Sequence, residues 1–382
     1  MKAKLIFSLV SLLCLGIILI LLGCEGNQGP AGLTGDDGDP GDPGNDYSIP
    51  VPEDRIFSVA VFNGRGDAHN GNATVLMTSD QDADLDGNTV IMDSVEVPPI
   101  IDGIDDGENV WNVPLADIVL GRTGSRDNFI VNARMRAAYD KDYIYLQVQW
   151  DEVASDGPVP FAIGANDAYR MWTFRDTLRA QGSSTILDTV MARDAVQIDD
   201  RVSIFWFMRG RFEDIVGWET DGCGIACHAD QATGMFTVID TTRLDAWEWG
   251  SVTTNPHGYG KDAFVQSASV GGLTGYLTDD GQPVYIENVM NRTTFPTRVP
   301  IYQHKEDPNA SASNPMDEWE VKGYELTNPA WLFGSTIPGA IATYPTKSAA
   351  DLFARGKFVD GTWTVEFKRA RDTGQSEDDL IF

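Results

Sequence analysis

The stretch A-A-Y-D-K-D-Y-I-Y-L-Q-V-Q-W, residues 137–150, contains two predicted strands and the turn between them. From Tyr143 to Trp150 apolar residues alternate with tyrosine and glutamine, which predicts a strand with one face in the core. Asp140-Lys141-Asp142 supplies a turn, and the preceding strand is predicted over Phe129 to Tyr139. This stretch therefore predicts a β-hairpin packed against a hydrophobic core.

Short runs of the same kind recur along the chain of 382 residues. Strands are expected over Ile56 to Phe62 and Ala73 to Met77, over Val202 to Met208, and around Trp363 to Phe367. One helix is expected, over Ala168 to Ala180. Recurrent short strands, long polar loops and little helix predict an all-β fold, a β-sandwich with a minor helical insertion.

The first 23 residues are expected to be a lipoprotein signal peptide. Lys2 and Lys4 precede an uncharged apolar run that ends in Leu21-Leu22-Gly23-Cys24, which resembles a bacterial lipoprotein box with Cys24 as the lipidated residue. We therefore expect an exported protein, lipid-anchored to the outer membrane on its periplasmic side or at the cell surface. The alternative is an uncleaved transmembrane anchor.

Residues 24–46 are expected to form a tether. Glycine occupies every third position from Gly26 to Gly44 with prolines between, which is a collagen-like tract. Like charges on its aspartates would weaken a triple helix, so we expect an extended, solvated chain, with trimerisation as the alternative. Residues 47–97 are then an N-terminal β segment, and residues 98–382 are the predicted main domain.

An acidic run near the end of the N-terminal β segment has the spacing of a calcium loop. Asp82, Asp84 and Asp86 stand at positions 1, 3 and 5, Gly87 stands at 6, and Asp93 stands at 12. A hard cation needs many oxygens from one short segment, which this spacing supplies. Calcium is thus a candidate cofactor, and an acidic hairpin loop is the alternative.

The segment D-G-C-G-I-A-C-H, residues 221–228, indicates covalent haem attachment. His228 directly follows Cys227, so thioethers from Cys223 and Cys227 would bring its imidazole under the iron. Three residues separate the cysteines, where the usual run has two. A disulfide, a zinc site or free thiols are alternatives, but no second ligand pair for zinc follows at short spacing. Of four cysteines, the other two lie at Cys14 and Cys24, in the signal and at the lipid site.

His228 is the predicted proximal iron ligand. The predicted sixth ligand is Met235, in the same loop, and His257 is the main alternative. Met208, at the end of the preceding predicted strand, is a further candidate for the haem pocket.

Trp247 and Trp249 are two residues apart, so in an extended segment they face the same side. They are candidate walls for a flat macrocycle, and ordinary core residues in the alternative. Asp245 is a candidate hydrogen-bond acceptor for the proximal imidazole.

The formal net charge of −29 restricts the partners. Such a surface repels phosphate backbones, so nucleic acid is not an expected partner. It would steer a basic redox partner toward the protein, an effect that salt screens. Solubility outside the cell is the alternative reason for the charge.

Six motifs together resemble the haem-binding domain family of ethylbenzene dehydrogenase and dimethyl sulfide dehydrogenase. In the family's order, over roughly Pro98 to Phe382, they are P-P-I-I-D-G, A-A-Y-D-K-D-Y-I-Y-L-Q-V-Q-W, D-R-V-S-I-F-W-F, G-C-G-I-A-C-H, D-A-W-E-W-G-S-V-T-T-N-P and D-G-T-W-T-V-E-F-K-R. The resemblance implies a β-sandwich that holds one haem in a loop-lined pocket and passes electrons. The dehydrogenase subunits bind haem without covalent attachment, through methionine and lysine, so this chain is closer to the family's covalent cytochrome branch.

The expected function is that of a monohaem c-type cytochrome in an anaerobic or extracellular respiratory chain, or of a partner to a molybdenum dehydrogenase. Catalysis within the chain is not expected, because no nucleophile and base pair, phosphate loop or molybdenum-binding sequence stands out. The family's fold is also similar to that of sugar-binding modules. The alternative is therefore a carbohydrate- or surface-binding lipoprotein with a Cys223–Cys227 disulfide and no haem.

Overall fold

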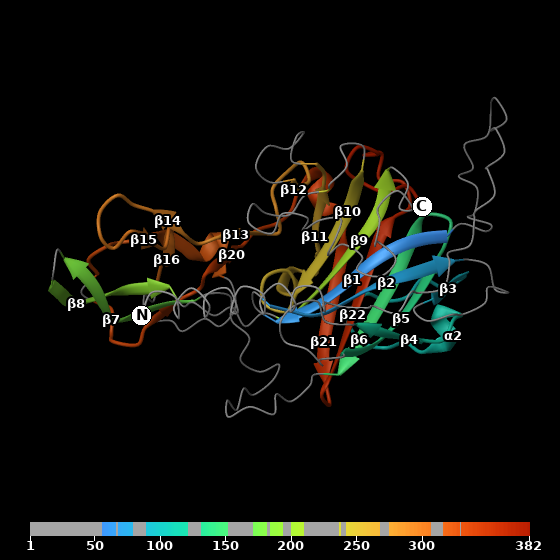
Figure 1. Ribbon diagram of the computed structural model, residues 1–382, viewed down its shortest axis with the longest axis horizontal. Coiled ribbons are helices and arrows are strands. Elements are labelled where there is room, and N and C mark those ends of the chain that lie inside the picture. Colours follow the sequence, from blue (N-terminus) through green and yellow to red (C-terminus); the bar gives the residue numbers. More distant parts are fainter. Residues whose placement is uncertain are drawn as a thin grey trace, which may run out of the picture. The chain divides into compact units, whose positions relative to one another are not determined.

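Almost every element of the computed structural model is a β-strand (Figure 1). The structure describes residues 56–65, 68–78, 89–120, 131–151, 171–181, 184–193, 200–209, 237, 242–267, 275–306, 316–328 and 330–382. The predicted signal peptide and tether lie outside these residues. Among the described residues, none of the helices has the length and apolar character needed to cross a membrane.

One long sheet has the strand order β12-β11-β10-β9-β1-β2-β3-β5-β6-β22-β21, with β4 paired to β5. Most neighbours are antiparallel, but β3 pairs parallel with both β2 and β5. The bounds of the strands are β1 Ile56–Arg65, β2 Ala68–Thr78, β3 Thr89–Ser94, β4 Ala116–Leu120, β5 Val131–Tyr139, β6 Tyr143–Asp151, β9 Asp200–Arg209, β10 Arg243–Gly250, β11 Lys261–Val265, β12 Tyr276–Thr278, β21 Phe353–Val359 and β22 Thr362–Ala370.

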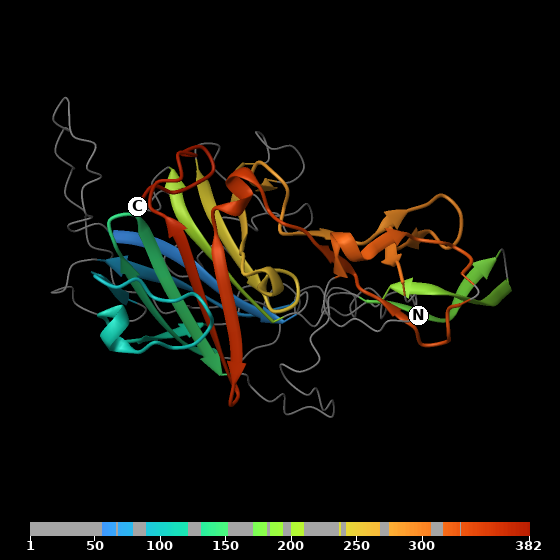
Figure 2. The same ribbon diagram turned by 180° about the vertical axis from the view of Figure 1, so that it is seen from behind.

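The two ends of this sheet face each other across a hydrophobic core. Trp247 of β10 lies 6.2 Å from Phe367 of β22 between ring centroids, and Trp249 lies 5.0 Å from Trp363. Strands β9, β10 and β11 form one layer and β21 and β22 the other, as Figure 2 shows from behind. The predicted all-β sandwich is therefore confirmed, and each strand expected from alternation is present.

The helix predicted over Ala168 to Ala180 is wrong. Residues Trp172–Gln181 form strand β7, which pairs in antiparallel register with β8, Ser184–Arg193, over the whole length of both. Trp172 and Phe174 are two residues apart and pack in one apolar cluster, with Phe174 5.5 Å from the ring of Trp331. The pairing with β8 decides the local structure, which the sequence of β7 alone leaves open.

The remaining elements are short. The only α-helix among the described residues is α2, Glu108–Trp111. Small sheets have the strand orders β13-β20-β17, β14-β15, β16-β18 and β19-β7-β8. Their strands are β13 Tyr285–Glu287, β14 Met290–Asn291, β15 Arg298–Val299, β16 Tyr302–His304, β17 Met316–Asp317, β18 Val321–Gly323, β19 Thr336–Ile337 and β20 Ala340–Ala342, and the 3-10 helices are η2 Asn255–His257, η3 Glu318–Glu320 and η4 Lys347–Ala350.

The apolar face of β6 lies in the core as predicted, and its polar face is buried as well. Tyr145, Gln147 and Gln149 are at most 5% exposed. The segment that contains the P-P-I-I-D-G motif covers them, and Asp105 accepts a hydrogen bond from Gln149 at 3.2 Å and pairs with Arg136. A second, polar layer thus lies outside the sandwich core.

Gly103 of that motif allows the close approach. Its φ of +77° favours glycine, and a Cβ there would lie 2.6 Å from the backbone nitrogen of Lys357. The backbone N–H groups of Asp102 and Gly103 both donate to one carboxylate oxygen of Glu366, at 3.0 and 2.9 Å. The motif is therefore required for packing against β22 and β21.

Candidate functional site

The predicted haem residues belong to the connection between β9 and β10. Cys223, Cys227, His228 and Met235 lie outside the described residues, so their haem roles stay predictions. The strands on either side are described, and they pair with each other up to Arg209 and Arg243. The connection therefore begins and ends at the same end of the β9–β10 pair, and β10 is flanked on its other side by β11.

Thr237 fixes the later part of this connection to the sandwich. Its backbone nitrogen donates to the carbonyl of Gln266 at 3.1 Å, and its hydroxyl donates to the carbonyl of Thr242 at 3.0 Å. The Arg243 guanidinium donates to the side-chain oxygen of Gln266 at 2.9 Å. Thr237 itself is 1% exposed, so the chain is held beside the end of β11 two residues after Met235.

Trp247 and Trp249 lie inside the sandwich core. Trp247 is fully buried, and its ring lies 4.9 Å from that of Trp206. Trp249 is 1% exposed, and its indole nitrogen donates to Asn255 at 3.2 Å. This packing is the role that the sequence offered as the alternative, and contact with a haem stays a prediction.

Met208 and His257, the other two candidate haem residues, lie in strand β9 and in the 3-10 helix η2. Met208 is half-buried near the end of β9, one residue before Arg209 and the cysteine-containing connection. His257 is in η2, where its ring stacks on Tyr344 at 4.8 Å and its Nε2 lies 3.2 Å from Asp317 Oδ1. For His257 to serve as the sixth ligand, Nε2 would have to leave Asp317.

Of the predicted calcium ligands, the structure describes only Asp93, in strand β3. Asp82, Asp84 and Asp86 lie outside the described residues. Asp93 accepts hydrogen bonds from the backbone of Ser94 at 2.7 Å and from the side-chain amide of Asn112 at 2.8 Å. The calcium loop thus stays a prediction.

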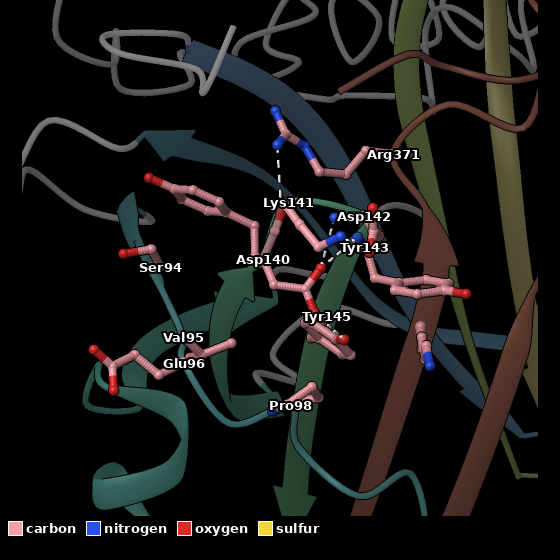
Figure 3. Close-up of a pocket in the computed structure, with 12 residues that line it drawn as sticks. Ser94, Val95, Glu96, Pro98, Asp140, Lys141, Asp142, Tyr143, Tyr145 and Arg371 are labelled. Atoms are coloured by element: carbon pink, nitrogen blue, oxygen red, sulfur yellow. Dashed lines mark hydrogen bonds and ion pairs between the residues drawn. The ribbon is translucent and has the colours of Figure 1, made fainter. Parts of the chain in front are cut away.

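A cavity of about 640 Å³ lies between the β5–β6 turn, β22 and the segment after β3 (Figure 3). The Lys368 ammonium lies 3.9 Å from the ring centroid of Tyr143. The Tyr145 hydroxyl donates to Asp140 Oδ2 at 2.7 Å, and burial, together with that carboxylate, raises the pKa of Tyr145. The size of the cavity suits a small ligand, and its lining combines aromatic rings with a cation.

A second group of polar side chains lies inside the sandwich, around Arg369 of β22. Its Nη1 atom lies 2.6 Å from Asp245 Oδ2, 3.0 Å from Asp379 Oδ1 and 3.8 Å from Asp262 Oδ1. All four side chains are at most 1% exposed. Asp279 follows β12, and its backbone nitrogen donates to the carbonyl of Asp262 at 3.4 Å. We call Asp245, Asp262, Asp279 and Asp379 the aspartate cluster.

Burial dominates the electrostatics of the aspartate cluster. It raises the pKa of Asp245 to about 7, although Arg369 opposes the rise. Burial, reinforced by the charge of Asp379, raises the pKa of Asp279 to about 9. For Asp262, burial raises the pKa well above its usual range, again against Arg369. One arginine therefore does not compensate four buried carboxylates.

One sequence feature could have indicated this cluster, namely a charged residue on an otherwise apolar strand face. Asp245 shares a face of β10 with Trp247 and Trp249, and Arg369 shares a face of β22 with Val365 and Phe367. A charged residue in the register of a buried apolar face requires a buried partner. The partners come from separate segments, so the sequence alone does not pair them.

One protein-family model matches the region of the chain that contains most of these residues. Residues 113–382, more than two thirds of the chain, match the family model described as Ethylbenzene dehydrogenase. This family is a haem-binding domain family linked to redox enzymes. The matched region includes β9, β10, their connection and the whole aspartate cluster. No curated protein matched the chain. The extent of the family match shows that this chain belongs to the ethylbenzene dehydrogenase family of haem-binding domains.

Proposed function

We propose that this protein is an exported, lipid-anchored monohaem c-type cytochrome that transfers electrons to or from a redox partner. One observation carries the proposal: the only Cys-x-x-x-Cys-His run of the chain lies within the region that matches a haem-binding family. A family that binds haem and a run that can attach it covalently point to the same cofactor.

The donor set of the β9–β10 connection fits a covalently held haem. The thiols of Cys223 and Cys227 would each add across one vinyl group, which loses no atoms. His228 would hold the iron, with Met235 or His257 as the second ligand. When bound, haem supplies a one-electron carrier. The chain's own part is to tether it, to provide an axial nitrogen and to hold the connection at Thr237.

The location of the protein is part of the same proposal. A signal that ends at Cys24 and a glycine-repeat tether would hold the domain outside the cytoplasm, where c-type attachment takes place. The partner is a redox protein in an anaerobic or extracellular respiratory chain, a molybdenum dehydrogenase being one candidate. The net charge of −29 favours a partner with a basic docking face.

Expression in a host that attaches c-type haem tests the proposal. We expect a Soret band that survives acid–acetone extraction, and an intact mass raised by one haem. The double variant Cys223→Ser/Cys227→Ser should lose both signals. Cys24→Ser is the matched control, because it removes the lipid site and should keep the covalent haem.

The same preparations test the sixth ligand. Met235→Leu should remove the near-infrared sulfur-to-iron band of the oxidised protein, whereas His257→Gln should leave that band in place. A colourless mature protein with a Cys223–Cys227 disulfide and no added mass contradicts the proposal. It would support the sugar- or surface-binding alternative instead.

A further inference from the structure

The aspartate cluster has the geometry of a cation site. One carboxylate oxygen from each of Asp245, Asp262 and Asp379 lies within 4.8 Å of the others. Two oxygens that bind one calcium ion at 2.3–2.6 Å lie at most about 5 Å apart. Oxygens from three different segments, namely β10, β11 and the chain after β22, therefore converge closely enough to share one ion.

Several oxygens of the cluster have no hydrogen-bond donor although they are buried. Among the residues that the structure describes, none donates to either oxygen of Asp262, to either oxygen of Asp279 or to Oδ1 of Asp245. These three residues are at most 3% exposed. Native structures rarely leave buried acceptors in this state, because an unpaired buried acceptor destabilises the fold and a charged one does so more strongly. A bound cation would supply the partner that these oxygens lack.

The charge balance of the described side chains also favours a bound cation. The four carboxylates of the cluster face one guanidinium, that of Arg369, whose Nη2 atom is also engaged with the carbonyl of Leu380 at 2.8 Å. Asp245 Oδ2 accepts the backbone N–H of Leu380 at 2.9 Å, and Asp379 Oδ2 accepts the Thr373 hydroxyl. The hydrogen-bond donors therefore lie near Asp379 and Oδ2 of Asp245. The oxygens that accept no hydrogen bond from the described residues are mainly those of Asp262 and Asp279.

We propose that Asp245, Asp262 and Asp379 bind one Ca²⁺ ion, with Asp279 as a further carboxylate at the edge of the site. An all-oxygen donor set selects a hard cation over zinc or copper, which prefer nitrogen and sulfur. Calcium accepts irregular geometry and many protein ligands, whereas magnesium keeps several waters and requires a regular octahedron. The buried, carboxylate-rich site suits calcium better.

The site would join three parts of the fold. Asp245 and Asp262 are on neighbouring strands of one layer, β10 and β11. Asp379 belongs to the segment after β22, which follows the opposite layer. A shared ion would thus hold that segment against the sandwich where β10 begins, next to the end of the β9–β10 connection. This role is structural and does not depend on the proposed haem.

Metal analysis of the full chain tests the site. The acidic loop of Asp82 to Asp93 is a separate calcium candidate, so the measurement uses the double variant Asp82→Asn/Asp86→Asn. After treatment with EDTA and addition of CaCl₂ alone, we expect one Ca²⁺ per chain at pH 8. We also expect a Tm that rises with the calcium concentration, because an ion that binds only the folded state stabilises it.

Two substitutions in the same background make the test specific. Asp262→Asn should lose both the bound ion and the dependence of Tm on calcium. Asp280→Asn is the matched control, because Asp280 is next to Asp279 in sequence but its side chain is 74% exposed and paired with Lys347. That control should bind Ca²⁺ as the parent does.

Two results would overturn the proposal. One is a parent chain that holds no stoichiometric Ca²⁺ and melts at the same temperature in CaCl₂ and in EDTA. The other is an Asp262→Asn variant that binds Ca²⁺ as tightly as its parent. Should Asp262→Asn not fold, Asp279→Asn takes its place, and it should weaken calcium binding without abolishing it.

Discussion

Glu366 of β22 is a buried carboxylate whose partners come from the outer polar layer. It is fully buried, and Oε2 accepts the backbone N–H groups of Asp102 and Gly103. Gln147 donates to Oε1 at 2.8 Å. Burial still raises its pKa to about 7, although these three donors act in the opposite direction. The protonated form is therefore favoured in the folded protein relative to the unfolded chain.

This shift predicts how stability depends on pH. The folded pKa of Glu366 is raised above its ordinary value of 4.5, so its favourable contribution is complete below 4.5 and is lost as pH rises through about 7. The loss amounts to about 3 kcal/mol for the full shift. Glu366→Gln removes the charge but keeps an acceptor for the two N–H groups, so it should flatten this slope.

The measurement is the free energy of unfolding in urea between pH 4.5 and pH 8. Glu325→Gln is the control, because Glu325 is exposed and pairs only at the surface with Lys322. Its pH profile should match that of the parent. Equal slopes for Glu366→Gln and the parent would show that Glu366 does not carry this dependence.

At the scale of single elements, strand β21 approaches the core through Gly356. A Cβ on Gly356 would lie 2.2 Å from Cζ2 of Trp249. Asn255 holds the strand there, because its Oδ1 accepts the Gly356 N–H at 2.8 Å and its Nδ2 donates to the Gly356 carbonyl at 3.0 Å. The strand and the indole ring therefore have no room to separate.

Gly356→Ala should consequently lower the free energy of unfolding, by about 1–3 kcal/mol, as overpacking of a core does. Gly323→Ala, in the exposed strand β18, is the matched control, because among the described residues no atom beyond its chain neighbours lies within 4 Å of its Cβ position. Chemical denaturation of both variants gives the comparison. A Gly356→Ala variant as stable as Gly323→Ala would contradict the packing described here.

The elements also show how far sequence patterns reach. Alternation over Tyr143 to Trp150 identified β6, because a strand with a fully apolar face imposes a period of two. It did not reveal that Gln147 and Gln149 are buried too, since the covering segment lies some forty residues earlier in the chain. The helix predicted over Ala168 to Ala180 is wrong because the pairing of Trp172–Gln181 with β8 decides the local structure, and the pattern of one segment does not contain its pairing.

The two candidate sites also differ in whether their residues are close together in the sequence. The cysteine and histidine run is local, so the sequence itself offers haem attachment as a prediction. The aspartate cluster joins residues from β10 and β11 and from the segments after β12 and β22, and no local pattern connects Asp245 with Arg369 of β22. Strands of two or three residues, such as β14 and β17, are too short to show a period.

At the scale of the whole molecule, 57 acidic and 28 basic residues give a strongly negative protein. Its rate of electron exchange with a basic cytochrome should fall steeply between low and physiological ionic strength, because salt screens the long-range attraction. Stopped-flow mixing measures this rate. An acidic partner of similar potential is the control, and its rate should rise with salt. A rate with the basic cytochrome that does not change with salt would show that charge does not steer the encounter.

The order of strands in the long sheet determines how the chain can reach its final form. Strand β1 pairs with β9, and β6 pairs with β22, so the sheet joins segments that are far apart in sequence. Such non-local topologies fold in milliseconds to seconds or more slowly, because long loops must close before their contacts form. We expect slow refolding of this domain, because β6 cannot complete its pairing until β22, near the C-terminal end of the chain, joins the sheet.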